Sequence, residues 1–391
     1  MNYNFEAIDR FATDCAKWDN IKLNGFAEDT LPLWVADMDF PTLPEITESL
    51  QKRISHPIYG YTWTATGQAA STCRWLKARH GLDVREDWLL TAPSVVAAFN
   101  MAIQCYTKEQ DAILILEPEY YPIKAAILHN DRQVVVSELR LEEGHYELDF
   151  LDFESKIKEF QVKLLIFSSP HNPVGRVWTK AELKRIGSIC KQHGVLVFSD
   201  EIHQDFVFPP HGFVSFLSAG EDHANFSILA TSASKTFNLA GLKFSNVIIP
   251  DEVLRKLYFR QLRKCGIDSQ NLLGSIATKA AYDNGEQWVD ELLVKLQSNI
   301  DGFRGLLKQH LPLAKLIEPE GLYLLWVDFR AYGYSAEELN RIILETAHVW
   351  LDDGTMFGPS GDGFQRFNLA TSEGVIEEAV LRIASALQAG R

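Results

Sequence analysis

Short apolar runs alternate with amphipathic segments through the middle of the chain. Each run is rich in β-branched or aromatic residues and is bounded by polar or turn residues. The runs lie at residues 111–116, 133–136, 163–167, 195–198, 226–230 and 246–249. Runs of this length and composition predict strands that are buried on both faces.

Helical patterns separate these predicted strands. Thr179 stands three residues before Glu182, which is the spacing of a capping box at a helix start. Gly194 suits the end of the same helix, since glycine readily adopts the left-handed conformation of a helix C-terminus. A second helix is predicted at residues 97–105. Alternating strands and helices indicate an α/β domain with a mostly parallel sheet flanked by helices.

The last third of the chain has a different order of elements. Helices are predicted at residues 290–309, 335–348 and 374–387, and strands at 321–329 and 366–370. This order predicts a smaller α+β domain, and the first fifty or so residues look irregular. We therefore expect an N-terminal segment (1–48) packed on the small domain, a large α/β domain (49–285) and a small C-terminal domain (286–391).

Composition and charge narrow the classes of function. The chain has 391 residues, of which 46% are hydrophobic and 23% charged, as in a soluble globular protein. Its 38 basic and 52 acidic residues give a net charge of −14. An acidic balance argues against nucleic acid and anionic membranes as partners.

The cysteines and the N-terminus bear on location. The 5 cysteines are far apart and lack metal-site spacing, so we expect free thiols and no metal. Met1–Glu6 has no basic start followed by an apolar run, and no apolar stretch approaches the ~20 residues that span a bilayer. We expect a cytoplasmic protein without a membrane partner.

Three polar segments follow predicted strands, where α/β proteins place ligands. They contain Asn172, Asp200 and Lys235. Lys235 stands in a serine-rich turn with no neighbouring acid, and a desolvated lysine has a lowered pKa and can act as a nucleophilic amine. Taken singly, each has an ordinary explanation: an Asn-Pro turn, a helix-capping aspartate and a solvated lysine.

Together, the segments HNPVG (171–175), SDEIH (199–203) and SASKTFNLAGL (232–242) resemble the fold-type I pyridoxal 5′-phosphate enzymes, the class I/II aminotransferase superfamily. The resemblance covers nearly the whole chain and implies an aspartate-aminotransferase-like fold. PLWVADMDF (32–40), Tyr59-Gly60-Tyr61 and residues 170–178 are most similar to the cystathionine β-lyase-like, or C–S β-lyase, branch. Ordinary aminotransferases usually lack the WVADMDF segment and carry tyrosine in place of His203.

The resemblance implies roles around the cofactor ring. Lys235 would hold pyridoxal phosphate covalently and then move the substrate α-proton, with Asp200 paired to the pyridine nitrogen. Asn172 would donate to the phenolic oxygen, and Tyr120 would stack on the ring, although the adjacent Tyr121 is an alternative. His203 either contacts the cofactor or supports Asp200, and His171 is open to the same two readings.

Further residues would bind the cofactor phosphate. The start of a predicted helix offers backbone N–H groups to a phosphate. Ser94 could add a hydroxyl donor or cap that helix. Lys243 replaces the arginine of many relatives and keeps the charge without the bidentate fork. The implied phosphate residues are Ser94, Val95, Val96, Ser232, Ser234 and Lys243.

Substrate contacts are implied for Arg366, Tyr61, Val35 and Asn172. Arg366 would grip the substrate α-carboxylate with its planar fork. Tyr61 would reach the cofactor from a partner subunit, which makes the active unit a homodimer with a shared active site; the other reading is a buried structural tyrosine. Tyr323 could contact the substrate or only pack.

The resemblance implies a C–S β-lyase that cleaves L-cystathionine or related thioether amino acids to a thiol, pyruvate and ammonia. The alternative is an aminotransferase, which would use the same Lys235, Asp200, Asn172 and Arg366. A non-catalytic regulatory protein is a third reading, which the intact set of these residues disfavours.

Overall fold

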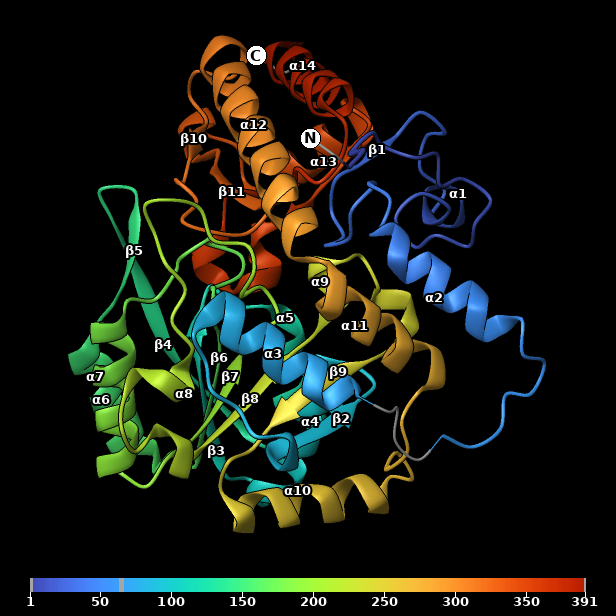
Figure 1. Ribbon diagram of the computed structural model, residues 1–391. Coiled ribbons are helices and arrows are strands. Elements are labelled where there is room, and N and C mark those ends of the chain that lie inside the picture. The colour runs from blue at the N-terminus through green and yellow to red at the C-terminus, as the bar shows by residue number, and fades with distance from the viewer. Residues whose placement is uncertain (1–2, 63–66, 390–391) are drawn as a thin grey trace.

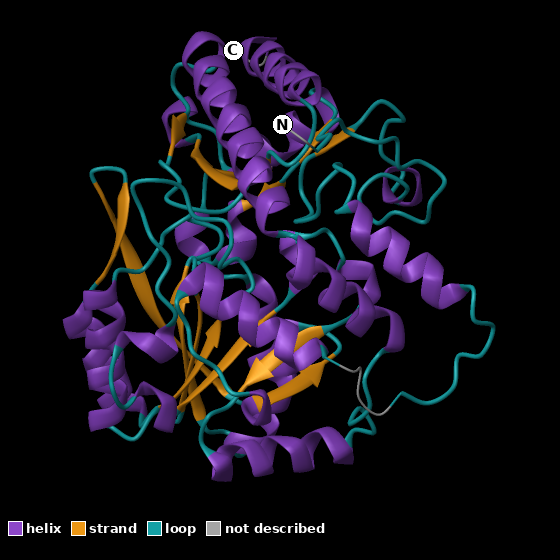
Figure 2. Ribbon diagram, viewed as in Figure 1, coloured by secondary structure: helices purple, strands orange, loops and turns teal. Residues whose placement is uncertain are grey.

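The computed structural model describes residues 3–62 and 67–389. An eight-stranded sheet forms the lower half of the molecule, enclosed by helices (Figures 1 and 2). Its strand order is β2-β9-β8-β7-β6-β3-β4-β5. The strands are β2 (Leu89–Ala92), β3 (Ala112–Glu117), β4 (Gln133–Glu142), β5 (His145–Leu148), β6 (Leu164–Ser168), β7 (Leu196–Asp200), β8 (Ser227–Thr231) and β9 (Ser245–Ile248).

The centre of this sheet is parallel, as the sequence predicts. β4, β3, β6, β7 and β8 pair in parallel, and every residue of β3, β6 and β8 is buried. The edges are antiparallel: β9 pairs with both β8 and β2, and β5 turns back on β4. A short apolar run predicts that a strand is buried, but it does not predict whether the strand runs parallel or antiparallel to its neighbours. The sequence therefore does not predict the antiparallel direction of β9.

Helices cover both faces of the sheet. On one face lie α4 (Val95–Tyr106), α5 (Tyr121–His129) and α10 (Glu252–Lys264), whose apolar residues share a core cluster with Ile113, Ile166 and Ile228. On the other face lie α6 (Phe150–Phe160), α7 (Lys180–Gln192) and α8 (Phe216–Ala219), packed on Leu114, Leu165 and Val197. The alternation of side chains along each strand sends neighbours to opposite faces.

Helix α7 confirms the predicted capping box. The Thr179 hydroxyl accepts from Glu182 N at 3.2 Å, and the Glu182 carboxylate accepts from Thr179 N at 2.9 Å. Helices α3 (Gln68–His80) and α11 (Leu272–Asn284) pack against each other. Helix α2 (Pro44–Ile54) packs on α11 and begins with a proline, which suits the first turn of a helix.

The smaller unit lies at the top of Figure 1. An antiparallel sheet of order β10-β11-β14-β13 is built from β10 (Lys315–Leu316), β11 (Leu324–Asp328), β13 (Asp352–Asp353) and β14 (Phe364–Asn368). Its helices are α12 (Glu286–His310), α13 (Ala336–Arg341) and α14 (Glu373–Ala389). The predicted helix at 335–348 is shorter as an α-helix, because a π-helical turn, Ile342–Thr346, follows α13.

The N-terminal segment runs beside this smaller unit (Figure 1). After α1 (Asn20–Leu23), β1 (Leu31–Pro32) pairs in parallel with β12 (Val349–Trp350). Phe5, Leu33 and Phe40 join one core cluster with side chains of α12 and α14. The same cluster continues into α11, so packing does not mark a sharp division near residue 285, and the domain boundaries stay predictions. Among the helices of the described residues, none has the length and apolar composition needed to cross a bilayer.

Candidate active site

A cavity of about 140 Å³ lies at the carboxyl ends of β6, β7 and β8. In an open parallel sheet this edge is where ligands bind. Most of the residues that the sequence singles out line it together. They are Ser94, Val95, Val96, Tyr120, Asn172, Asp200, His203, Ser234, Lys235 and Lys243.

Lys235 stands in a short helix, α9 (Ala233–Thr236), directly after β8. Ser232 caps this helix by accepting from Ser234 N, and Lys235 Nζ donates to the carbonyl oxygen of Ala36 at 2.6 Å. Burial lowers the pKa of Lys235 to about 8, while the carboxylates of Asp37 and Asp200 oppose that effect. With this pKa, roughly a tenth of the amine is in its neutral, nucleophilic form at pH 7, far more than for a solvated lysine.

Asp200 ends β7 and is buried beside the cavity. Its Oδ1 accepts from Ile202 N at 3.1 Å. Burial raises the pKa of Asp200 to about 7, and the Lys235 ammonium acts in the opposite direction. A carboxylate in such a place favours a cationic partner, because the opposite charge relieves the cost of burying it.

Asn172 and Arg366 come from distant elements and meet beside the cavity. Arg366 lies on β14, and its Nη1 donates to Asn172 Oδ1 at 2.9 Å. Its Nη2 donates to the Trp34 carbonyl oxygen at 3.0 Å and to the Asp352 carboxylate. The guanidinium also stacks over the Phe357 ring, with its carbon 4.9 Å from the ring centre.

Backbone carbonyls of residues 34–37 connect these groups. Trp34 O accepts from Arg366, and Ala36 O accepts from both Lys235 and the Tyr323 hydroxyl. Val35 O and Asp37 O both accept from Asn368 Nδ2. The WVAD turn thus holds the lysine and the arginine in one arrangement.

A buried ion cluster anchors that turn. Lys17 Nζ lies 2.8 Å from Asp39 Oδ2, and both side chains are buried. Arg10 joins Asp37 at 2.8 Å and Asp39 at 3.0 Å, and Trp18 Nε1 donates to Asp39. Burial acts to raise the pKa of Asp39, but the Lys17 ammonium and other donors outweigh burial and hold that pKa below its usual value.

The family model for aminotransferase class I and II matches residues 28–383. The chain belongs to this family. It is 38% identical over 387 residues to cystathionine β-lyase PatB of Bacillus subtilis (strain 168), covering 99% of this chain and 100% of the relative.

Solved structures agree with that family. Cystalysin of Treponema denticola, whose structure contains pyridoxal 5′-phosphate, is 34% identical with a TM-score of 0.96, and the match covers 100% of both chains. The PLP-bound C–S lyase of Staphylococcus hominis is 33% identical with a TM-score of 0.92, covering 99% of this chain and 98% of that one. The predicted aspartate-aminotransferase-like fold and family are confirmed.

Within this class I/II aminotransferase fold, two predictions left open by the sequence gain structural detail. Tyr120 lines the cavity, whereas Tyr121 begins α5 and packs edge-on against Phe357, with ring centres 5.8 Å apart. Ser94 caps α4 by accepting from Ala97 N at 3.1 Å. Its hydroxyl still has its own proton to donate, so the two readings of Ser94 are compatible.

Ser232 differs from its expected place. Its hydroxyl donates to the Phe244 carbonyl oxygen at 2.7 Å and accepts from Ser234 N, and it is not among the cavity-lining residues. The structure commits the Ser232 side chain to the turn that carries Lys235. Ser234 and Lys243 do line the cavity, and contact of Ser232, Ser234 and Lys243 with a cofactor phosphate stays a prediction.

His203 lines the cavity as a buried imidazole. Burial and the nearby Lys235 and Arg366 charges lower its pKa well below the usual value. Its ring lies against Phe206 and Tyr323, each with centres 6.3 Å away. Its Nδ1 has no hydrogen-bond partner within the described part of the chain, so this nitrogen makes no supporting bond to Asp200.

Tyr61 is fully exposed in the single chain, so the described part of its own chain does not bury it, and both readings of Tyr61 stay predictions. The segment before it also presents apolar side chains, including Ile58 and Tyr59. Val35 contributes its carbonyl to Asn368, and Tyr323 is buried with its hydroxyl on Ala36.

Two buried carboxyl groups near the site were missed by sequence reasoning. Glu119 accepts from the Ser168 hydroxyl at 2.5 Å and from Tyr120 N at 2.8 Å, and burial raises its pKa to about 8. Asp352 pairs with Arg366. Glu119 stands next to Tyr120, but its contact with Ser168, like that of Asp352 with Arg366, forms only where separate elements meet.

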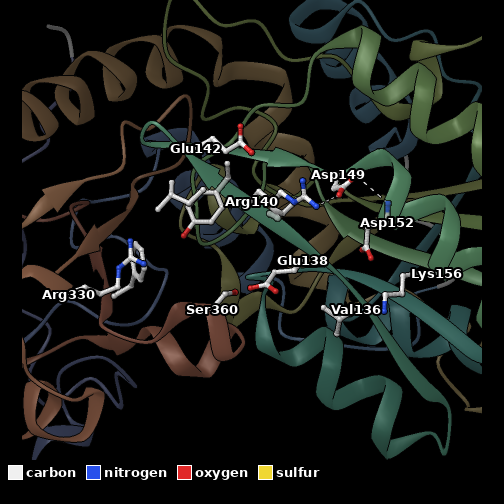
Figure 3. Close-up of a pocket in the computed structure, with 13 residues that line it drawn as sticks. Val136, Glu138, Arg140, Glu142, Asp149, Asp152, Lys156, Arg330 and Ser360 are labelled. Carbon is white, nitrogen blue, oxygen red and sulfur yellow. Dashed lines mark hydrogen bonds and ion pairs between the residues drawn. The ribbon is translucent and has the colours of Figure 1, made fainter.

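A second groove of about 920 Å³ lies between β4 and the smaller unit (Figure 3). Its two arginines are ion-paired: Arg140 with Asp149 inside the groove, and Arg330 with Asp328 at 2.7 Å. It contains none of the residues singled out from the sequence. Among the described residues, no cluster of His, Cys, Asp or Glu could hold a metal ion.

Buried His171 makes stability depend on pH. Its Nε2 lies 2.7 Å from the Pro118 carbonyl oxygen, and burial lowers its pKa to about 4. The unfolded chain binds this proton near its ordinary value, so stability is lost as pH falls below ~6.5 toward 4. Replacing His171→Gln should remove about 2 kcal/mol of the fall in unfolding free energy between pH 7 and pH 5. Urea unfolding at pH 7 and pH 5 measures this fall in unfolding free energy for both proteins. An equal fall in the variant and the unaltered protein would contradict a neutral buried His171.

Proposed function

We propose that this protein is a pyridoxal-phosphate-dependent C–S β-lyase, which cleaves L-cystathionine or a related thioether amino acid to a thiol, pyruvate and ammonia. The observation that carries the proposal is the Lys235 amine of lowered pKa, which shares one cavity with Asp200 and Asn172. Relatives named as cystathionine β-lyase and C–S lyase, similar over almost the full chain, support this choice.

The donor set of the cavity fits pyridoxal phosphate. It combines an amine of lowered pKa, a buried carboxylate and the N-terminus of α4, which presents backbone N–H groups to an anion. Lys235 would attach the cofactor, Asp200 would pair with its ring nitrogen, Asn172 would donate to its phenolic oxygen and Tyr120 would stack on its ring. Ser94, Val95, Val96, Ser234 and Lys243 would hold its phosphate. When bound, the cofactor stabilises negative charge that develops at the substrate α-carbon.

The protein's own residues supply binding and proton transfer. Arg366 would hold the substrate α-carboxylate and so place the α-carbon toward Lys235. Lys235 would take the α-proton, since a lysine of lowered pKa is matched to proton transfer near neutral pH. The bond between the substrate Cβ and sulfur then breaks, and its electron pair leaves with the sulfur as a thiolate. Hydrolysis of the released three-carbon fragment produces pyruvate and ammonia.

Purified, cofactor-loaded protein with L-cystathionine and no added keto acid tests this function. We expect thiol, pyruvate and ammonia to appear in equal amounts. If none appears, and amino transfer begins once a keto acid is supplied, the protein is an aminotransferase instead. Partner binding without either reaction would favour the regulatory reading.

We also propose that the active unit is a homodimer in which Tyr61 enters the partner's cavity. The fully exposed Tyr61, which follows exposed Ile58 and Tyr59, supports this.

The cysteines are unpaired in the structure, which supports a reducing compartment such as the cytoplasm.

Mixing two inactive variants tests the shared site. Tyr61→Ala should impair the partner's site, while Lys235→Ala should impair its own. A mixed dimer then has one site with both defects and one site with neither, so activity should return after the two variants are unfolded and refolded together. Tyr59→Ala is the matched control for Tyr61. Absence of recovery in verified mixed dimers would contradict a Tyr61 contribution across the interface.

A further inference from the structure

Asp352 lies directly opposite Arg366 in the small sheet. β13 and β14 are antiparallel, and the two residues are register partners. Side chains of directly opposite residues project to the same face with their Cβ atoms about 5 Å apart. Each residue is 3% exposed, and Arg366 Nη2 donates to Asp352 Oδ2. The arginine expected to bind a substrate carboxylate therefore already holds one.

The remaining bonds of Arg366 show what a substrate would have to replace. Nη2 also donates to the Trp34 carbonyl oxygen at 3.0 Å, and Nη1 donates to Asn172 at 2.9 Å. Nε is buried and has no hydrogen-bond partner among the described residues. A guanidinium offers a carboxylate two bidentate edges, Nε with Nη2 or Nη1 with Nη2. Both edges include Nη2, whose two protons are committed to Asp352 and Trp34.

Nη2 of Arg366 has two acceptors, the Asp352 carboxylate and the Trp34 carbonyl oxygen. Of the two, the Asp352 carboxylate is the one whose negative charge repels a carboxylate ligand. Trp34 O belongs to a backbone turn that other bonds fix, and it carries no net charge. Asp352 is buried and ion-paired with Arg366, so a second carboxylate beside it meets like-charge repulsion in a poorly solvated place. The charge of the Arg366 guanidinium is therefore already balanced by the Asp352 carboxylate before substrate binds.

We propose that Asp352 is a specificity-determining residue of the carboxylate site, where it competes with the substrate carboxylate for Nη2 of Arg366. This inference rests on the proposed function, because it takes Arg366 as the carboxylate-binding residue. An amino acid must displace Asp352 to make a bidentate contact, whereas an amine without a carboxylate leaves the pair intact. Asp352 thus sets how strongly the protein prefers an amino acid over the matching amine.

Neutral replacement of Asp352 tests the competition. Cofactor-loaded protein is titrated with L-alanine and with ethylamine, which lacks the carboxylate, and binding is followed by cofactor absorbance. Neither compound has a leaving group on Cβ, so affinity is measured apart from elimination. Asp352→Asn should tighten L-alanine at least ~10-fold, because like-charge repulsion is removed, and should change ethylamine less than about twofold.

The adjacent Asp353→Asn is the matched control, since Asp353 caps Thr355 N and bonds to Asn340 and not to Arg366. It should leave both affinities unchanged. Asp352→Ser provides a second neutral variant if Asp352→Asn unfolds. Weaker binding of L-alanine by the folded neutral variant would show that Asp352 orients Arg366, and unchanged binding would show no role; either result overturns the inference.

Arg366→Lys separates this inference from the proposed function. If Arg366→Lys weakens L-alanine strongly while Asp352→Asn changes nothing, only the competition by Asp352 is wrong. If Arg366→Lys leaves L-alanine affinity unchanged, the carboxylate does not bind at Arg366, and that part of the proposed function fails with it.

Discussion

Replacing Lys235→Ala should lower the rate of thiol release from L-cystathionine by at least ~10³-fold, because both the nucleophilic amine and the proton-transferring base are lost. The fold should survive, since within the described part of the chain the side chain makes one hydrogen bond, to Ala36 O. Initial rates of thiol and pyruvate release, with saturating cofactor added to both proteins, measure the effect.

Lys184→Ala is the matched control, because Lys184 is an exposed lysine on α7. It should keep the activity of the unaltered protein. Treatment with borohydride adds a second readout: the cofactor should become fixed to the unaltered chain and to the control, but not to the Lys235→Ala variant. Elimination that persists at the original rate in the Lys235→Ala variant would show that another residue carries the chemistry.

Replacing Lys17→Met should lower the unfolding free energy by about 3 kcal/mol, because removing one partner leaves the buried Asp39 carboxylate without its closest cation. Arg10 and Trp18 still contact Asp39, which keeps the effect at the lower end of that range. The loss should also loosen the turn at residues 34–37, whose carbonyls hold Lys235 and Arg366. Urea unfolding and the KM for L-cystathionine measure the two consequences.

The exposed Lys22→Met is the control for this change and should be within about 0.5 kcal/mol of the unaltered protein. Adding Asp39→Asn to Lys17→Met should recover part of the lost stability, since the uncompensated charge is then gone. A Lys17→Met variant as stable as the control would mean that Arg10 alone neutralises Asp39.

The sequence by itself determined the core of the fold and of the candidate site. Short apolar runs predict the buried parallel strands. The polar segments after β6, β7 and β8 place Asn172, Asp200 and Lys235 at one sheet edge. Both inferences depend on local periodicity and on the rule that parallel strands end together. The same local logic identified the Thr179 capping box.

The tertiary structure decided which groups face these residues. Asp352 meets Arg366 because β13 and β14 pair in a particular register, and a shift by one residue would turn the carboxylate to the other face. The contacts of Ser168 with Glu119 and of Asp39 with Lys17 likewise join residues that are 49 and 22 positions apart. The direction of β9 is likewise set by its pairing with β8, a strand that is separate from it in the chain. Local spacing along the chain carries information about neighbours in sequence, whereas these contacts depend on how separate elements dock.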